Sequence, residues 1–171
     1  NGMTTNYLYN ESTGYTEEDE AHPLSTYAKA KYEGELLISQ IMENTENTSK
    51  MYIVRTSWVF GKGSMNFVEK IIELSKEKDE LKVVDDQVSS PTYSKDLAYF
   101  SWELIKKGCE SGIYHFTNDG IASKYEEAQY ILEKISWKGN LIRVKREELG
   151  LLAERPKFSK LSCKKIKEKL G

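Results

Sequence analysis

Residues 51–60 read MYIVRTSWVF, and Gly61 follows them. The stretch is rich in β-branched and aromatic residues, which favour strands, and a glycine is a common place for a strand to end. The pattern predicts one continuous strand over residues 51–60. It is the strongest strand pattern in the chain, so the other elements are assigned outward from it.

A helix is predicted before this strand, over residues 26–43. Its apolar residues Ala30, Leu37, Ile38 and Ile41 recur at spacings close to the helical period. We therefore expect this face of the helix to be buried in the core.

The alternation of strand and helix continues along the chain. Ser94 and Ser123 are the expected N-caps of two helices, Ser123 forms a capping box with Glu126, and Gly108 ends the first of these helices. Strands are predicted at 3–9, 81–84, 113–116 and 141–144, and further helices at 66–78, 95–107, 124–135 and 162–170. This alternation is typical of an α/β fold, here expected as a single domain over residues 1–171.

The predicted helix 26–43 carries Tyr27 four residues before Lys31. Residues at this spacing share one helix face about 6 Å apart, and a nearby cation favours the phenolate form of a tyrosine. The pair therefore suggests proton transfer to a sugar or alcohol oxygen. A half-buried tyrosine beside a lysine whose stem covers apolar surface would give the same spacing, so the pair decides little alone.

Composition limits the function classes further. The chain has 171 residues, a net charge of −2, two cysteines without metal-ligand spacing, and no apolar run near the ~20 residues of a transmembrane helix. Binding to nucleic acid or to a membrane is therefore not expected. We expect a cytoplasmic protein whose two cysteines are reduced. A glycine-rich turn that could hold a dinucleotide pyrophosphate is absent from the sequence. Because the chain also begins at Asn1, we expect it to be a piece of a longer protein.

Several blocks, taken in chain order, resemble one known family. They lie at residues 3–9 (MTTNYLY), 15–19 (YTEED), 27–35 (YAKAKYEGE), 55–61 (RTSWVFG), 83–93 (VVDDQVSSPTY), 112–117 (GIYHFT) and 155–161 (RPKFSKL). The order and content resemble the dTDP-4-dehydrorhamnose reductases, which are extended short-chain dehydrogenase/reductases (SDRs). The resemblance covers nearly the whole chain and begins after the family's glycine-rich cofactor motif.

The resemblance implies a partial Rossmann-like sheet of the extended SDR type, with a C-terminal substrate-binding α/β part. It implies reduction of the C4 ketone of dTDP-4-dehydro-L-rhamnose by NADPH or NADH, in the pathway to bacterial surface polysaccharide. By resemblance, Tyr27 is the proton donor, Lys31 holds the nicotinamide ribose and lowers the pKa of the phenol, and Thr5 hydrogen-bonds the substrate carbonyl. Ser57 and Val59 are expected beside the nicotinamide end of the cofactor.

Five residues are expected at the dTDP-sugar by the same resemblance: Asn6, Tyr7, Trp58, Pro91 and Arg155. Asn6 is a departure, because the family usually has aspartate there. Trp58 could offer a flat apolar face to a deoxysugar, and Arg155 could pair with the diphosphate. A core aromatic, a rigid turn and a surface arginine are the plain alternatives for Trp58, Pro91 and Arg155. His115, between two aromatic residues, is expected to be a packed structural histidine.

Some members of the family dimerise through a magnesium site, and Lys95 stands about where one of its acids would be, so no metal is predicted. Without the cofactor motif we expect the chain alone to have little activity. An unpaired edge of an incomplete sheet leads to the hypothesis of a homodimer or larger assembly. Two alternatives stay open: a non-catalytic, regulatory SDR-like subunit, and another nucleotide-sugar epimerase or dehydratase.

Overall fold

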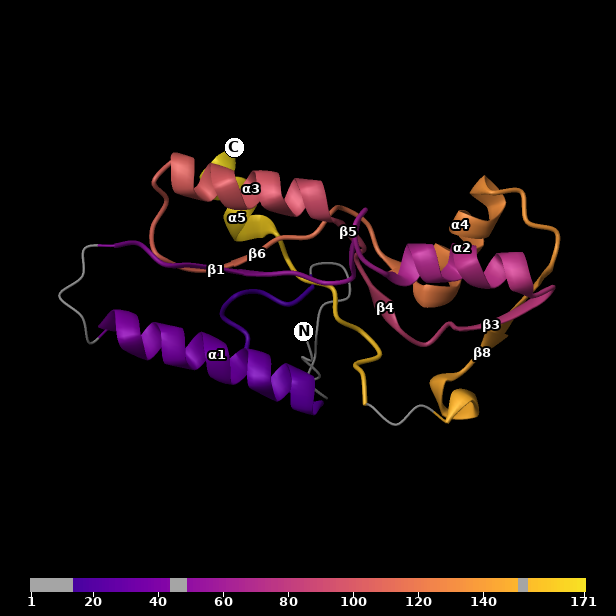
Figure 1. The fold of residues 1–171 in the computed structure, drawn as a ribbon. Helices are drawn as coiled ribbons and strands as arrows, with labels where there is room; N and C mark the ends of the chain where they lie inside the picture. Colours follow the sequence, from indigo (N-terminus) through magenta and orange to yellow (C-terminus); the bar gives the residue numbers. More distant parts are fainter. Residues whose placement is uncertain (1–13, 44–48, 151–153) are drawn as a thin grey trace.

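The structure, a computed structural model, describes residues 14–43, 49–150 and 154–171. The strand predicted at 3–9 lies outside these residues, as do Thr5, Asn6 and Tyr7. Figure 1 shows an elongated molecule in which two groups of strands and helices lie side by side.

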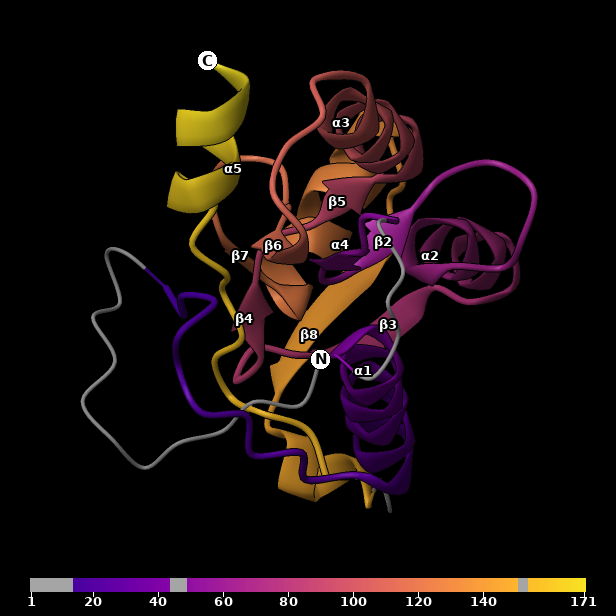
Figure 2. The same ribbon diagram turned by 90° about the vertical axis from the view of Figure 1, so that its left-hand side faces the viewer.

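The first group is built on a parallel pair of strands between helices. It contains α1 (Thr26–Glu43), β1 (Tyr52–Arg55), α3 (Ser94–Lys106), β6 (Gly112–His115) and α5 (Lys164–Leu170). Strand β1 pairs with β6, with Tyr52 opposite Gly112. Helices α3 and α5 lie on one side of the strands and α1 on the other (Figures 1 and 2). Leu104, Tyr114, Phe116 and Ile166 form the core of this group.

The second group repeats this plan with both helices on one face. It contains α2 (Phe67–Glu77), β3 (Glu80–Val84), α4 (Lys124–Lys134) and β8 (Asn140–Val144), and β3 pairs with β8 in parallel. Leu81 and Val83 are buried while Glu80 and Lys82 are exposed, as expected for a sheet with one covered face. The buried pair packs with Ile71 and other apolar residues of α2 and α4.

Short strands and the C-terminal segment connect the two groups. Strand β2 (Val59–Phe60) pairs with β5 (Thr92–Tyr93) in parallel, and β4 (Val88–Ser89) pairs with β7 (Ala122–Ser123) in antiparallel orientation. A 3₁₀ helix, η1 (Arg146–Leu149), follows β8. The C-terminal segment bridges Tyr15 at Leu161 and Val88 at Phe158. Tyr15, Phe158 and Leu161 form a small apolar cluster at this junction.

The prediction of one continuous strand over residues 51–60 is wrong. Strand β1 ends at Arg55, and β2 begins at Val59 and pairs with β5 instead of β6. Trp58 between them has a φ of 45°, in the left-handed region that a bulky residue rarely adopts. Strand-favouring side chains continue through the break. The position at which the strand changes partner is therefore set by the fold and not by local preference.

Most helix ends agree with the sequence. Helix α1 has the predicted bounds, the capping box of Ser123 and Glu126 is present, and Gly108 follows α3 with a φ of 61°. Ser94 is the first residue of α3 and not its N-cap, which is Tyr93 without a side-chain hydrogen bond. The terminal helix begins at Lys164, two residues later than predicted.

The buried face predicted for α1 is wrong. Leu37, Ile38 and Ile41 are 59%, 46% and 61% exposed, and Ala30 is exposed as well. The face turned toward the rest of the described structure is instead a more polar stripe at helical spacing, formed by Ala28, Tyr32, Glu35, Ser39 and Met42. An apolar stripe of α1 therefore faces outward. Within the described residues, no helix is both long and apolar enough to cross a membrane.

Candidate active site

Tyr27 and Lys31 lie in the first turns of α1. The hydroxyl of Ser25 accepts a hydrogen bond from the Ala28 N–H at 3.1 Å, which caps the start of the helix. The Lys31 ammonium lies 5.7 Å from the centre of the Tyr27 ring, and Tyr27 is 69% exposed. Helix α1 runs antiparallel to β1, so its first turns lie near the carboxyl end of β1 (Figure 1). In open α/β sheets this is the edge at which ligands bind.

A bidentate ion pair joins α1 to β1. Nε and Nη2 of Arg55 lie 2.9 Å and 2.6 Å from Oε2 of Glu35, and the two side chains are 9% and 21% exposed. Nη1 of Arg55 is buried without a hydrogen-bond partner among the described residues. Because Glu35 follows Lys31 by one turn, this pair determines how the helix presents Tyr27 and Lys31. The pair could not be predicted from the sequence, because nothing local relates residues 20 positions apart.

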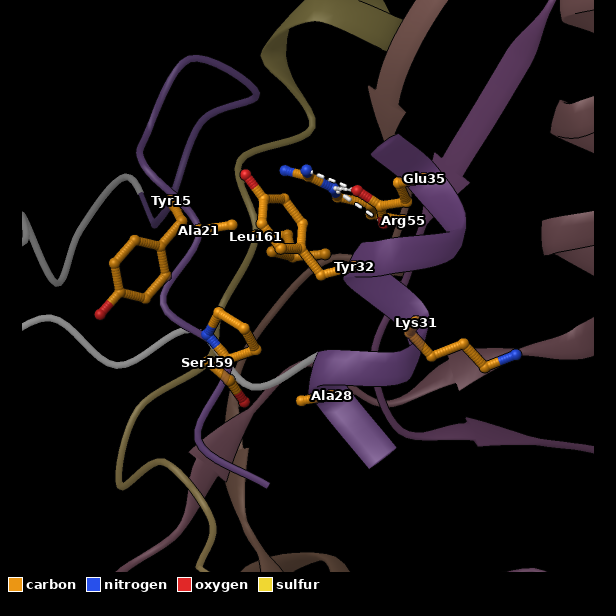
Figure 3. A pocket seen from close by; sticks show the side chains of 10 residues that line it. Tyr15, Ala21, Ala28, Lys31, Tyr32, Glu35, Arg55, Ser159 and Leu161 are labelled. Carbon is orange, nitrogen blue, oxygen red and sulfur yellow. Dashed lines mark hydrogen bonds and ion pairs between the residues drawn. The ribbon is translucent and has the colours of Figure 1, made fainter. Parts of the chain in front are cut away.

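A pocket lies against α1, and Tyr27 is not among the residues that line it. It is lined by Tyr15, Ala21, Pro23, Ala28, Lys31, Tyr32, Glu35, Arg55, Ser159 and Leu161. In Figure 3 the Lys31 side chain extends away from Tyr32 and the Arg55–Glu35 pair. Lys31 therefore belongs both to the pocket lining and to the pair with Tyr27, whereas the exposed Tyr27 is not part of the lining.

Ser57 and Val59 flank the break between β1 and β2. Ser57 is 1% exposed, and its hydroxyl donates to the Ser90 carbonyl at 2.9 Å. The hydroxyl of Ser89 lies 3.0 Å from that of Ser57 and 3.0 Å from the Ser159 carbonyl. The Ser57 side chain is thus engaged in an internal network, whereas Val59 is exposed; contact of either with a cofactor stays a prediction.

Pro91 stands directly before β5, beside this break. The Thr92 N–H donates to the Trp58 carbonyl at 3.1 Å, and the Tyr93 N–H donates to the Asn118 side chain at 2.7 Å. The hydroxyl of Ser90 donates to the Gly120 carbonyl at 2.5 Å. The segment 90–93, which includes β5, is therefore held from both sides and supports the backbone of Trp58.

Trp58 packs against a charged side chain that sequence reasoning missed. The Lys124 ammonium lies 3.6 Å from the centre of the Trp58 ring and 4.1 Å from that of Phe67. It also forms an ion pair with Glu127 at 2.7 Å. Burial lowers the pKa of Lys124, and the nearby charge of Arg155 lowers it further. The structure thus places the predicted residue Trp58 in direct contact with Lys124, and Arg155 acts on the same ammonium only through its charge.

Two other predictions concern histidine and metals. His115 is fully buried, with Nδ1 3.1 Å from the Tyr15 carbonyl, which confirms it as a packed structural histidine. In the part of the chain that the structure describes, no three or more His, Cys, Asp or Glu side chains are grouped as metal ligands would be.

Comparison with known proteins gives a consistent result. The sequence model of one family, described as the RmlD substrate binding domain, matches residues 3–171. The chain is 40% identical over 168 residues to the spore coat polysaccharide biosynthesis protein SpsK of Bacillus subtilis (strain 168), covering 97% of this chain and 56% of SpsK. It is 34% identical over 182 residues to the dTDP-4-dehydrorhamnose reductase of Aggregatibacter actinomycetemcomitans, covering 99% of this chain and 60% of that enzyme.

The fold agrees with that of a solved reductase. The crystal structure of dTDP-4-dehydrorhamnose reductase from Bacillus anthracis str. Ames in complex with NADP superposes with a TM-score of 0.83 at 37% identity, covering 91% of this chain and 53% of that one. This likeness confirms the predicted class, an α/β fold of the Rossmann-like, extended SDR type. The chain thus spans between half and about 60% of the length of these proteins.

Proposed function

The chain belongs to the RmlD substrate-binding-domain family, and from this premise we propose that it forms the sugar-binding and proton-donating part of a dTDP-4-dehydrorhamnose reductase. The observation that carries the proposal is the family match, which runs from residue 3 to residue 171. The name of the Aggregatibacter relative supports the reaction, and the name of SpsK supports a place in polysaccharide biosynthesis. The open face of α1 supports it further, because a substrate could reach Tyr27 there.

In the proposed reaction Tyr27 donates its hydroxyl proton to the C4 oxygen of the sugar, which gains negative charge as hydride reaches C4. A donor already in place near that oxygen stabilises the charge, and the proton must come from within about 3 Å. The Lys31 ammonium, 5.7 Å from the Tyr27 ring, stabilises the phenolate that remains. Thr5, from outside the described residues, is proposed as a second hydrogen-bond donor to the same oxygen.

The dTDP-sugar is proposed to bind between Trp58 and Arg155. Trp58 is half-buried, so part of its ring is open to a deoxysugar, and Arg155 is exposed and free to turn toward a diphosphate. Pro91 supports this region because it stands directly before β5, whose Thr92 N–H holds the Trp58 carbonyl. Asn6 and Tyr7, also outside the described residues, are proposed to contact the sugar.

NADPH is proposed as the cofactor, and it would supply the hydride. Lys31 suits the nicotinamide ribose, because its ammonium is exposed and makes no ion pair with another described residue. The chain has no glycine-rich turn for the pyrophosphate. Its residues therefore fit the nicotinamide end of the cofactor, and we expect weak binding of NADPH by this chain alone.

We further propose that the chain self-associates, since the apolar stripe of α1 at Leu37, Ile38 and Ile41 is exposed. Light scattering at high concentration should then give a mass above the 19.7 kDa of one chain. A monomeric mass would contradict this part of the proposal.

The proposed function is tested by a thermal-shift titration with dTDP-L-rhamnose and, separately, with NADPH. At 100 times its dissociation constant, a ligand stabilises the fold by about 2.7 kcal/mol. We expect a rise in Tm with the dTDP-sugar that is lost in Arg155→Ala, and little rise with NADPH. No rise with either ligand would favour the non-catalytic alternative. Rapid NADPH-dependent turnover by this chain would contradict the proposal that it binds NADPH only weakly.

A further inference from the structure

A lysine is buried at the amino end of α4. Lys124 is the first residue of that helix, and its ammonium lies between the rings of Trp58 and Phe67, at 3.6 Å and 4.1 Å from their centres. Glu127, one turn later, pairs with it at 2.7 Å, and the two side chains are only 11% and 9% exposed. We call this group the Lys124 cluster: Lys124, Glu127, Trp58 and Phe67.

The buried Lys124–Glu127 ion pair is not expected to add much to the stability of the folded chain. Burial lowers the pKa of Lys124 and raises that of Glu127, so each charged form is disfavoured by its surroundings. The amino end of a helix carries a partial positive charge, which also disfavours an ammonium. Replacing a buried ion pair by uncharged side chains of similar volume is often neutral or stabilising. The contacts that the ammonium makes with the rings are therefore the more informative feature.

Trp58 is held in an unusual conformation by its neighbours. Its φ is 45°, its carbonyl accepts the Thr92 N–H at 3.1 Å, and the side chain of Ser57 is bonded to the Ser90 carbonyl. These contacts hold the backbone conformation of Trp58. The orientation of its indole ring depends instead on the side chains that pack against the ring. A cation over an indole face is attracted by the electrons of the ring, most strongly where water is excluded. Lys124 covers one face in this way, and the ring stays partly open to solvent.

We propose that Lys124 is a positioning residue for substrate, which acts through Trp58: its ammonium holds the indole so that the open part of the ring meets the sugar of the dTDP-sugar. Glu127 keeps the ammonium charged and in place. The proposal rests on the proposed function, because it takes Trp58 as a sugar contact. Lys124 itself touches no ligand in it, since its ammonium is enclosed by the two rings and Glu127.

The test compares five forms of the 171-residue chain: wild type, Lys124→Met/Glu127→Gln, Lys124→Arg, Trp58→Ala, and Trp58→Ala combined with Lys124→Met/Glu127→Gln. The double substitution removes both charges at similar volume, and arginine restores a cation that also stacks on rings. Affinity for dTDP-L-rhamnose is measured by calorimetry. The indole N–H resonance of Trp58, identified with Trp58→Phe, is followed by NMR without ligand, and Trp102 and Trp137 serve as internal controls.

We expect Lys124→Met/Glu127→Gln to unfold at a Tm no lower than wild type, to move the Trp58 resonance alone, and to bind dTDP-L-rhamnose about tenfold more weakly. Lys124→Arg should keep most of the affinity, and the double substitution should have no further effect in the Trp58→Ala background. A loss that persists in that background would overturn the proposal, because Lys124 would then contact the ligand directly. Equal affinity of wild type and the double variant would also overturn it.

The failure of the proposed function gives a different result. In that case wild type would not bind dTDP-L-rhamnose at all, and the substrate-positioning role would be overturned with it. The shift of the Trp58 resonance would still report whether Lys124 holds the indole.

Discussion

His115 should make the stability of this protein depend on pH below neutrality. Its side chain is fully buried, and Nδ1 faces the Tyr15 carbonyl at 3.1 Å, so Nδ1 carries the proton of a neutral ring. Burial lowers the pKa of His115 from 6.5 to about 4, and the charge of Arg55 adds to the effect. Between those values the unfolded chain binds a proton on this histidine that the folded chain does not. The free energy of unfolding must therefore fall as the pH falls through this range.

The size of the effect follows from the shift. A difference of about 2.5 pKa units, from 6.5 to about 4, at about 1.4 kcal/mol per unit, corresponds to about 3.5 kcal/mol, of which about 3 kcal/mol is lost between pH 7 and pH 4. This is a large part of the stability of an ordinary domain. The contribution of His115 is fully present above pH 6.5, where both states are neutral.

Urea unfolding at pH 7, 6, 5 and 4 measures this loss in wild type and in His115→Asn. Asparagine keeps an N–H donor near the position of Nδ1 and does not titrate. Glu126, whose pKa is lowered by its hydrogen bond to the Ser123 N–H, loses stabilisation in acid in both proteins, so the difference between them isolates His115. We expect the variant to lose about 3 kcal/mol less than wild type between pH 7 and pH 4. Parallel curves, or a His115 pKa near 6.5 by NMR titration, would refute the reasoning.

Three further predictions test the packing and the helix ends. Gly139→Ala should lower stability by about 1–3 kcal/mol and shift tryptophan emission to longer wavelength, because the new Cβ would lie 2.1 Å from the Trp137 ring; unchanged emission would contradict this. Ser123→Ala should cost about 1 kcal/mol in urea unfolding by removing the capping box, and Ser123→Gly should cost less. Leu104→Ala should cost about 2–5 kcal/mol, since the side chain is fully buried, whereas Leu37→Ala on the exposed stripe should change stability by less than about 0.5 kcal/mol. Similar losses for the two leucines would show that α1 is buried in solution.

The part of the site that could be predicted from sequence is the part built on one element. Tyr27 and Lys31 are four residues apart, so a helix brings them together wherever it packs. The Arg55–Glu35 pair and the Lys124 cluster could not be predicted in this way. Lys124 meets Trp58 from 66 positions away, and only the approach of α4 to the β1–β2 break brings them into contact.

The sequence by itself determined the features that depend on near neighbours: the bounds of α1, the capping box at Ser123 and the alternation of strands and helices. Their hydrogen bonds and side-chain periods lie within a few residues. Only the tertiary structure decided which face of α1 turns inward and where the stretch 51–60 breaks at Trp58. Both depend on which other elements lie nearby. Apolar side chains are stabilised by burial only where another element covers them, and a strand changes partner only where a second strand is in reach.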